Sequence, residues 1–178
     1  MTKIQITGAA LAVLMAASLS ACKNGEAAKP VDAASIADAI KADEAQLLKD
    51  FNGRDAAKVA SHDAPDVVQM VHGAANLVGP AADEASDKQS FIDDPGQNFS
   101  VSNESVDVPA SGDMAVYRSN YVYKFADPKT KKPVTEVGNY IAGYKLQSDG
   151  SWKITWSVLS DTPATPATPP APAEPAKS

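Results

Sequence analysis

The segment "GYKLQSDGSWKITWSVLS" (Gly143–Ser160) predicts two strands joined by a tight turn. Asp149 and Gly150 supply the turn, because Asp-Gly favours the left-handed backbone of short hairpin loops. After the turn, large apolar residues alternate with polar ones, which is typical of a strand with one buried face. The alternation predicts one shared face for Trp152, Ile154, Trp156 and Val158.

Three further strands are expected upstream of this hairpin. The alternating segments are "FSVSNESVDV" (99–108), "MAVYRSNYVYKF" (114–125) and "TEVGNYIAGYKLQ" (135–147). In the middle one, Tyr117, Tyr121 and Tyr123 share a face opposite Arg118 and Lys124. In the next, Tyr140, Tyr144 and Leu146 share a face. The four segments together predict an antiparallel meander.

The residues before the meander predict helices and one strand. "ASIADAIKADEAQLLKDFNGRD" (34–55) has apolar residues near a 3.6-residue period, with Gly53 as its C-terminal cap and Asp55 as the N-cap of a second short helix. "DVVQMVH" (66–72) is a strand candidate with Val68, Met70 and His72 on one face, and "ADEASDKQSFIDDP" (82–95) is a third helix. Helices followed by an antiparallel meander indicate the α+β class.

Three segments resemble the nuclear transport factor 2-like superfamily, which includes ketosteroid isomerases and SnoaL-like cyclases. They are "GRDAAKVASHDAPDVV" (53–68), "LVGPAADEA" (77–85) and the hairpin segment 143–160, which is similar to the ending of a branch of unknown function. The resemblance covers about Ser35 to Ser160. It implies a cystatin-like cone, in which a curved antiparallel sheet wraps around N-terminal helices and leaves a pocket at its wide end. It also implies homodimers in many members.

The expected pocket lining combines aromatic and apolar side chains. Such a wall suits a small apolar or amphipathic ligand with one or two hydrogen-bonding groups. The alternative is that these side chains are ordinary core. The expected lining residues are Met70, His72, Tyr117, Tyr121, Tyr140, Tyr144, Trp156 and Val158.

The alternative function to ligand binding is a SnoaL-like or ketosteroid isomerase-like enzyme that uses His72 and the pocket tyrosines. The resemblance places the isomerases' base at Met70 or Val71, their helix tyrosine at Leu48 and their oxyanion acid at Ala142, so all three catalytic groups are replaced by apolar residues. No catalytic residue is therefore assigned, although His72 is a candidate base, since imidazole titrates near neutral pH. An acidic residue beside His72 would favour an enzyme, and strand phase makes Glu136 the nearest candidate.

No cofactor or metal is expected. His62 and His72 are the two histidines, and Asp63 and Asp66 stand near them without a metal-binding spacing. These aspartates are expected to solvate the turn into the first strand. The sequence contains no glycine-rich phosphate loop and no nucleophile elbow.

The N-terminus predicts export and lipid attachment. Lys3, an apolar stretch of about a dozen residues and the tetrad Leu19-Ser20-Ala21-Cys22 describe a secretory signal. The tetrad resembles the lipobox of bacterial lipoproteins, which implies that Cys22 is acylated and becomes the mature N-terminus. The alternative is a free cysteine behind an ordinary signal. The apolar stretch is too short to span a bilayer.

Four regions follow: a signal peptide (1–21), a linker (22–33), one folded domain (34–161) and a disordered Pro- and Ala-rich tail (162–178). The chain has 16 basic and 22 acidic residues, a net charge of −6, which disfavours nucleic acid as a partner. We expect the domain to face the periplasm, tethered to the membrane by its lipid. In Gram-negative sorting, an aspartate directly after the acylated cysteine retains a lipoprotein at the inner membrane. This chain has Lys23 at that position, which favours the outer membrane in a Gram-negative cell.

Overall fold

The computed structural model describes residues 31–162, which contain three helices and six strands. The predicted lipid attachment at Cys22, the signal peptide and the tail beyond residue 162 lie outside the described residues. The helices are α1 (Ala33–Asn52), α2 (Ala56–Ala60) and α3 (Pro80–Asp93). The strands are β1 (Asp63–Val71), β2 (Leu77–Val78), β3 (Asn98–Asp107), β4 (Met114–Ala126), β5 (Pro133–Leu146) and β6 (Trp152–Asp161).

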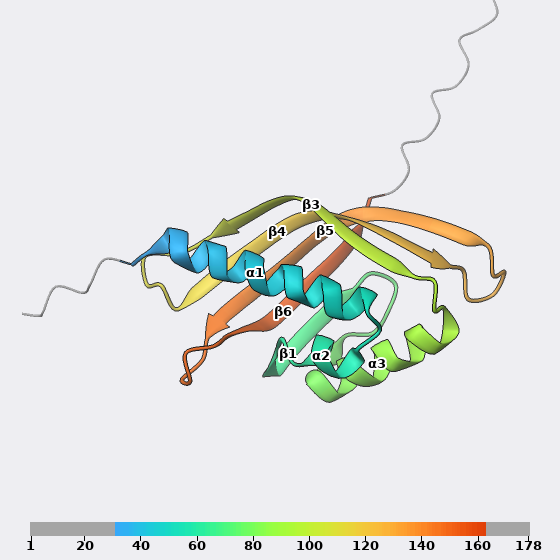
Figure 1. Ribbon diagram of the computed structural model, residues 1–178, viewed down its shortest axis with the longest axis horizontal. Coiled ribbons are helices and arrows are strands. Elements are labelled where there is room, and N and C mark those ends of the chain that lie inside the picture. Colours follow the sequence, from blue (N-terminus) through green and yellow to red (C-terminus); the bar gives the residue numbers. More distant parts are fainter. Residues whose placement is uncertain (1–30, 163–178) are drawn as a thin grey trace, which may run out of the picture. The chain divides into compact units, whose positions relative to one another are not determined.

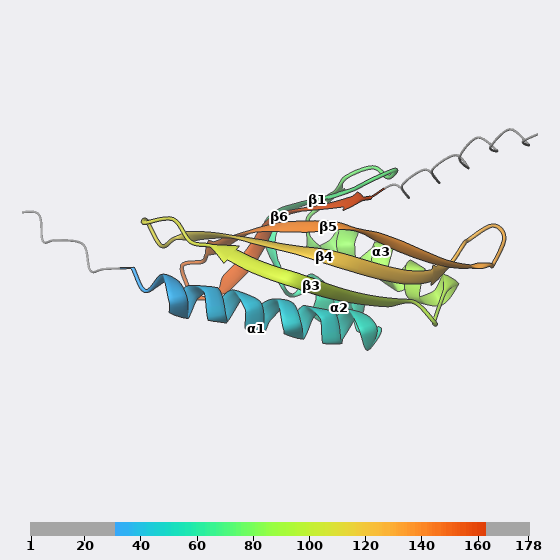
Figure 2. The same ribbon diagram turned by 90° about the horizontal axis from the view of Figure 1, so that it is seen from above.

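All six strands form one curved sheet in the order β2-β1-β6-β5-β4-β3. Neighbouring strands are antiparallel except β1 and β6, which pair in parallel. Helix α1 runs along one face of the sheet (Figures 1 and 2), where it packs on β3 and β4, while α3 packs on β1 and β2. The expected α+β fold with a helix-filled curved sheet is confirmed, and the short strand β2 is an addition to it. None of the helices within residues 31–162 is long and apolar enough to cross a membrane.

The turn after α1 is held by an arginine. Gly53 ends the helix as expected, but its φ of −79° is not left-handed. A glycine is required there for space, because a Cβ would lie 2.9 Å from the carbonyl oxygen of Lys49. The left-handed residue is Arg54, with φ of 64°. Its guanidinium donates to the carbonyl oxygens of residues 51, 52, 95 and 97, so one side chain joins the end of α1 to the loop before β3.

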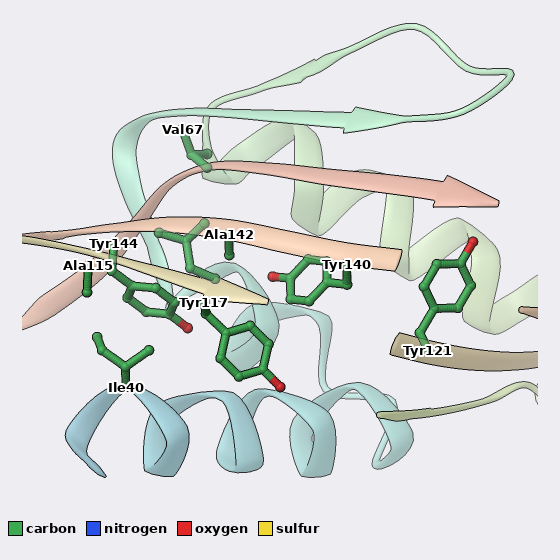
Figure 3. Close-up of a cluster of buried hydrophobic side chains, with 9 residues drawn as sticks. Ile40, Val67, Ala115, Tyr117, Tyr121, Tyr140, Ala142 and Tyr144 are labelled. Carbon is green, nitrogen blue, oxygen red and sulfur yellow. The ribbon is translucent and has the colours of Figure 1, made fainter. Parts of the chain in front are cut away.

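The solid part of the core lies between the first half of α1 and strands β4 and β5. Tyr117 and Tyr144 point from the sheet toward α1 and Ile40 (Figure 3), and all three side chains are fully buried. Ala115 and Ala142 fill the space between these rings. The small residues let the tyrosines pack tightly, and this end of the cone is therefore closed.

A bulge in β6 reverses the face of its second half. Ile154 pairs with Tyr144, while Trp156 pairs with Gly143, so Thr155 is an extra residue on the β6 side. Its hydroxyl donates to the carbonyl oxygen of Gly143 at 3.0 Å. An extra residue shifts the alternation by one. The expected common face of Trp152, Ile154, Trp156 and Val158 is therefore wrong: the last two lie on the outer face of the sheet.

The predicted phase of β1 is also wrong. Val67 is fully buried and Gln69 and Val71 continue its face inward, which places Val68 and Met70 outside. In the register, Val68 lies beside Trp156 and Met70 beside Val158, and Ile141 of β5 follows Val158. These five residues form an outer apolar patch on the side of the sheet away from the helices.

Candidate functional site

The wide end of the cone is hollow. A cavity of about 410 Å³ opens between α1, α2, α3 and the inner face of the sheet. This volume is in the usual range for a small-molecule site. Tyr123 and Phe99 face it from β4 and β3, and Phe51 closes the α1 side with edge contacts to both rings. The later residues of α1 therefore line a cavity, while its earlier residues pack into solid core.

Most of the cavity wall is apolar. Leucine, valine, isoleucine and phenylalanine side chains reach it from every helix but α3 and from strands β1, β2, β3 and β6. They are Leu47, Leu48, Phe51, Val59, Val71, Leu77, Phe99, Val101, Ile154 and Leu159. A wall of this kind favours a ligand with a sizeable apolar body, because burial of such a surface is favourable by about 25 cal/mol per Å².

Three carboxyl groups form an acidic wall on one side of the cavity: Asp63, Asp83 and Asp87. Asp83 and Asp87 are one helical turn apart on α3, and Asp63 begins β1 and accepts a hydrogen bond from Gln69 at 3.1 Å. Burial raises the pKa of Asp63 to about 7 and that of Asp87 to about 8, and the charge of Asp83 adds to both shifts. Burial raises the pKa of Asp83 as well. These groups therefore hold protons more strongly than ordinary aspartates.

A histidine and a glutamate meet at another side of the cavity. Nε2 of His72 lies 3.0 Å from Oε1 of Glu136, and the same oxygen accepts a hydrogen bond from the hydroxyl of Tyr121. Tyr121 reaches Glu136 by lying flat over Gly138, where a Cβ would be 2.6 Å from the ring. His72 is about one-third exposed, so this pair borders both the cavity and the solvent. The glutamate expected from strand phase is confirmed as the neighbour of His72.

A second polar network lies behind the cavity. The Tyr144 hydroxyl oxygen is 2.9 Å from Oε1 of Glu44 and 3.0 Å from Oδ2 of Asp43. The other oxygen of Asp43 binds Nδ1 of His62 at 2.8 Å, and Nε2 of His62 lies 3.3 Å from Asp50. A hydroxyl has one hydrogen to donate, and burial raises the pKa of Glu44 to about 8, so at neutral pH Glu44 donates to Tyr144 and Tyr144 donates to Asp43. This chain links α1, β5 and the start of β1.

The structure brings only two of the eight expected lining residues to the cavity. His72 and Tyr140 lie on its wall. Tyr117, Tyr121 and Tyr144 are in the solid core, because the closed end of the cone extends further along the sheet than alternation alone indicates. Met70, Trp156 and Val158 belong to the outer apolar patch. Six of the eight residues that were expected to line the cavity therefore lie elsewhere.

The positions that match the isomerases' catalytic groups are apolar in space as well as in sequence. Leu48 and Val71 line the cavity, and Ala142 is fully buried in the core. The first strand's alternative position, Met70, faces away from the cavity. A base in this cavity therefore has to come from another place. The lining offers His72, Glu44, Glu136 and the three aspartates of the acidic wall.

The acidic wall was not anticipated from the sequence. Asp63 was expected to solvate a turn, yet it is 6% exposed, and Asp66 alone is exposed. The signal for this wall in the sequence is the spacing of Asp83, Asp87 and Ser90, which places them on one helix face in a segment with few apolar residues. Within the described part of the chain, no three His, Cys, Asp or Glu side chains are grouped as metal ligands would be.

Comparisons with known proteins identify the fold. No protein-family model matches the sequence, and no curated protein matches it. Solved structures do match. An NTF2-like protein with a cystatin-like fold from Novosphingobium aromaticivorans is 18% identical, with a TM-score of 0.59 over 73% of this chain and 84% of that one. LinA is 15% identical, with a TM-score of 0.64 over 72% of this chain and 86% of its own.

A ketosteroid isomerase-like protein from Erwinia carotovora atroseptica is 20% identical, with a TM-score of 0.60 over 71% of this chain and 96% of that one. At these identities the likeness concerns the backbone. The fold is the NTF2-like, cystatin-like fold that the sequence resemblance implied.

Proposed function

We propose that this NTF2-like domain binds a small ligand with an apolar body in the cavity at the wide end of its cone. The observation that carries the proposal is the cavity itself: about 410 Å³, lined by apolar side chains from two of the three helices and four of the six strands. An apolar hollow of this size leaves its wall without packing partners, which lowers the stability of the fold. A bound ligand would restore those contacts.

Titration of the domain with 2-naphthylmethanol, a neutral planar alcohol, tests this proposal by calorimetry. We expect a Kd between about 10 μM and 1 mM, since the probe is small and its affinity comes from burial. Val71→Phe fills the cavity from β1 and should weaken binding at least tenfold while leaving the melting temperature unchanged or higher. Val137→Phe, on an exposed position of β5, is the matched control. Binding that survives Val71→Phe would place the probe elsewhere.

A second candidate function is proton transfer by His72. The observation that favours it is the 3.0 Å contact between His72 and Glu136 at the cavity wall. A carboxylate that accepts a hydrogen bond from one ring nitrogen orients an imidazole, as acid–base catalysis requires. We propose that the pair removes a proton from a ligand that occupies the cavity.

A suitable reporter is 5-nitrobenzisoxazole, an apolar molecule with an acidic ring C–H. Loss of that proton to a base forms a nitrile and breaks the N–O bond, which releases a coloured phenolate. We expect measurable turnover that falls at least tenfold in His72→Ala and less in Glu136→Gln. Turnover that is unchanged in His72→Ala, or no turnover above buffer, would reject this candidate while leaving ligand binding in place.

We also propose that the domain is tethered to a bacterial membrane through Cys22 and faces the periplasm. The lipobox-like tetrad and the short apolar stretch support this placement. Cys22→Ser should move the protein from the membrane fraction to the soluble fraction. Retention of the variant in carbonate-washed membranes would mean that a different anchor operates.

The outer apolar patch supports a further proposal, that two copies of the domain associate. Val68, Met70, Ile141, Trp156 and Val158 lie side by side on a sheet face that carries none of the helices. Patches of this kind mark interaction surfaces. Light scattering should give twice the mass of the chain, and Val158→Lys should return the mass of one copy. A single-chain mass for the unaltered protein would exclude this association.

A further inference from the structure

Asp63, Asp83 and Asp87 place three carboxyl groups on the wall of a largely apolar cavity. Among the described residues that line it, five carry carboxyl groups and none is a lysine or an arginine. Carboxyl groups buried together repel one another when ionised, and each loses its hydration. The arrangement therefore lowers the stability of the empty protein, and such arrangements concentrate at functional sites.

The second observation is an unused hydrogen-bond acceptor. Asp83 is 4% exposed, and its Oδ2 atom is buried at the cavity without a hydrogen-bond partner among residues 31–162. Oδ2 of Asp87 is in the same condition. Buried polar atoms without partners are rare, because each costs about 1–3 kcal/mol. Two of them one helical turn apart, on the same cavity, indicate that a donor is supplied from outside the chain.

We infer that the acidic wall is the binding site for the ammonium group of a primary amine whose apolar body fills the rest of the cavity. This inference rests on the proposed ligand-binding function and names the class of ligand. An –NH₃⁺ group has three N–H donors, which matches the open acceptors of Asp83 and Asp87 and the carboxyl group of Asp63. Its charge offsets the mutual repulsion of the three groups in a poorly solvated place.

Other cations fit this wall less well. The described acidic residues are not grouped as metal ligands, so a divalent ion lacks the coordination that it requires. A quaternary ammonium ion carries no N–H and would leave the acceptors of Asp83 and Asp87 unpaired. Above about pH 8, where the carboxyl groups of the wall are ionised, the wall repels anionic ligands.

Other polar and titratable groups also lie near these carboxyls and shape the pH dependence. Gln69 donates to Asp63, the charge of His62 acts on Asp63, and Glu44 and Tyr140 line the same cavity. Because the pKa values of Asp63 and Asp87 are about 7 and about 8, the wall holds protons at pH 6 and loses them by pH 8.5. The preference for an ammonium ion should therefore grow over this range.

The test compares 2-naphthylmethylamine with 2-naphthylmethanol, which differ only in the group at the end of one skeleton. At pH 8.5 we expect the amine to bind the full-length protein at least tenfold more tightly than the alcohol, and at pH 6 the ratio should shrink. Asp83→Asn should reduce the ratio to near one. Asp87→Asn is the second variant, in case one substitution prevents folding.

Asp93→Asn is the matched control, since Asp93 is an exposed residue of the same helix. The N,N,N-trimethyl derivative should bind at least fivefold more weakly than the primary amine. Equal affinities for the amine and the alcohol in the unaltered protein would overturn this inference and leave ligand binding by the cavity intact. If neither compound binds, both the inference and the proposed function fail. A ratio that persists in both Asp83→Asn and Asp87→Asn would place the ammonium group elsewhere.

Discussion

The indole of Trp156 lies directly over the α-carbon of Gly143 on the neighbouring strand. The two residues pair across β5 and β6, next to the bulge at Thr155, and a Cβ at position 143 would overlap the Cε2 atom of the ring. The ring can therefore cover the backbone only because the strand beneath it has no side chain there. This contact holds the shifted half of β6 in register.

Gly143→Ala should lower the free energy of unfolding by about 1–3 kcal/mol, as overpacking of a close contact does. Urea denaturation of the two single variants and the double variant with Trp156→Ala measures the coupling. We expect the alanine at 143 to cost much less when the indole is absent. An equal cost in both backgrounds would show that the contact between the two residues is not its cause.

Arg54→Met should lower the free energy of unfolding by about 2–3 kcal/mol. The substitution keeps much of the side-chain length but removes the donors to four backbone carbonyl oxygens. Hydrogen bonds that involve a charged group each contribute about 1.5–3 kcal/mol where they are shielded from water. Arg118→Met is the control, because Arg118 makes an exposed ion pair with Asp107, and its loss should cost under about 1 kcal/mol. Equal losses would mean that the Arg54 contacts are worth no more than a surface pair.

The protein should be more stable at pH 5 than at pH 8. The folded-state pKa values of Glu44, Asp63 and Asp87 are raised to about 8, about 7 and about 8, so the folded protein binds more protons than the unfolded chain above about pH 4.5. Stability then falls as the pH rises through this window, by up to about 1.4 kcal/mol per pH unit for each excess proton. His62 acts in the same direction: burial lowers its pKa, but Asp43 and Asp50 outweigh this and raise it.

Glu44→Gln checks the assignment of this pH dependence. The amide stays neutral and can still donate to Tyr144, so the variant should fold and its melting temperature should fall less between pH 5 and pH 8. Glu84→Gln, at a position that makes an ion pair with Lys88, should leave the pH profile as it was. A profile that is identical in Glu44→Gln and the unaltered protein would show that Glu44 ionises normally.

The sequence predicted the architecture because strand alternation and helix caps are local signals. The four strands of the meander lie within two residues of their expected bounds, and Asp55 caps α2 through Lys58 as expected. The inner face of β4 was also predicted correctly, since that strand pairs with β5 without interruption. Glu136 followed from the same regularity, because it lies in phase with Tyr140.

The cavity could not be predicted in the same way. One extra residue at Thr155 turned Trp156 outward. In β1, Val67, Gln69 and Val71 form the inner face, so Met70 faces outward, and alternation alone does not say which face of a strand is the inner one. Bulges depend on contacts between strands and leave no clear mark in one strand's own pattern. The burial of the aspartates of α3 could not be predicted, because charged residues on a helix are normally on its solvent face. These aspartates are buried because α3 packs against β1.

The parallel pairing of β1 with β6 sets a condition on how the chain can fold. Val68 in β1 pairs with Trp156 in β6. The first strand in the chain therefore cannot complete its pairing before the last strand is available. Closing a loop of this length costs entropy before any contact repays it, and folds rich in distant pairings form slowly. During synthesis from the N-terminus, α1 and the β3–β5 meander can assemble first, while β1 has only the two residues of β2 beside it. The cavity is complete only when β6 lies between β1 and β5, because both β1 and β6 contribute lining residues.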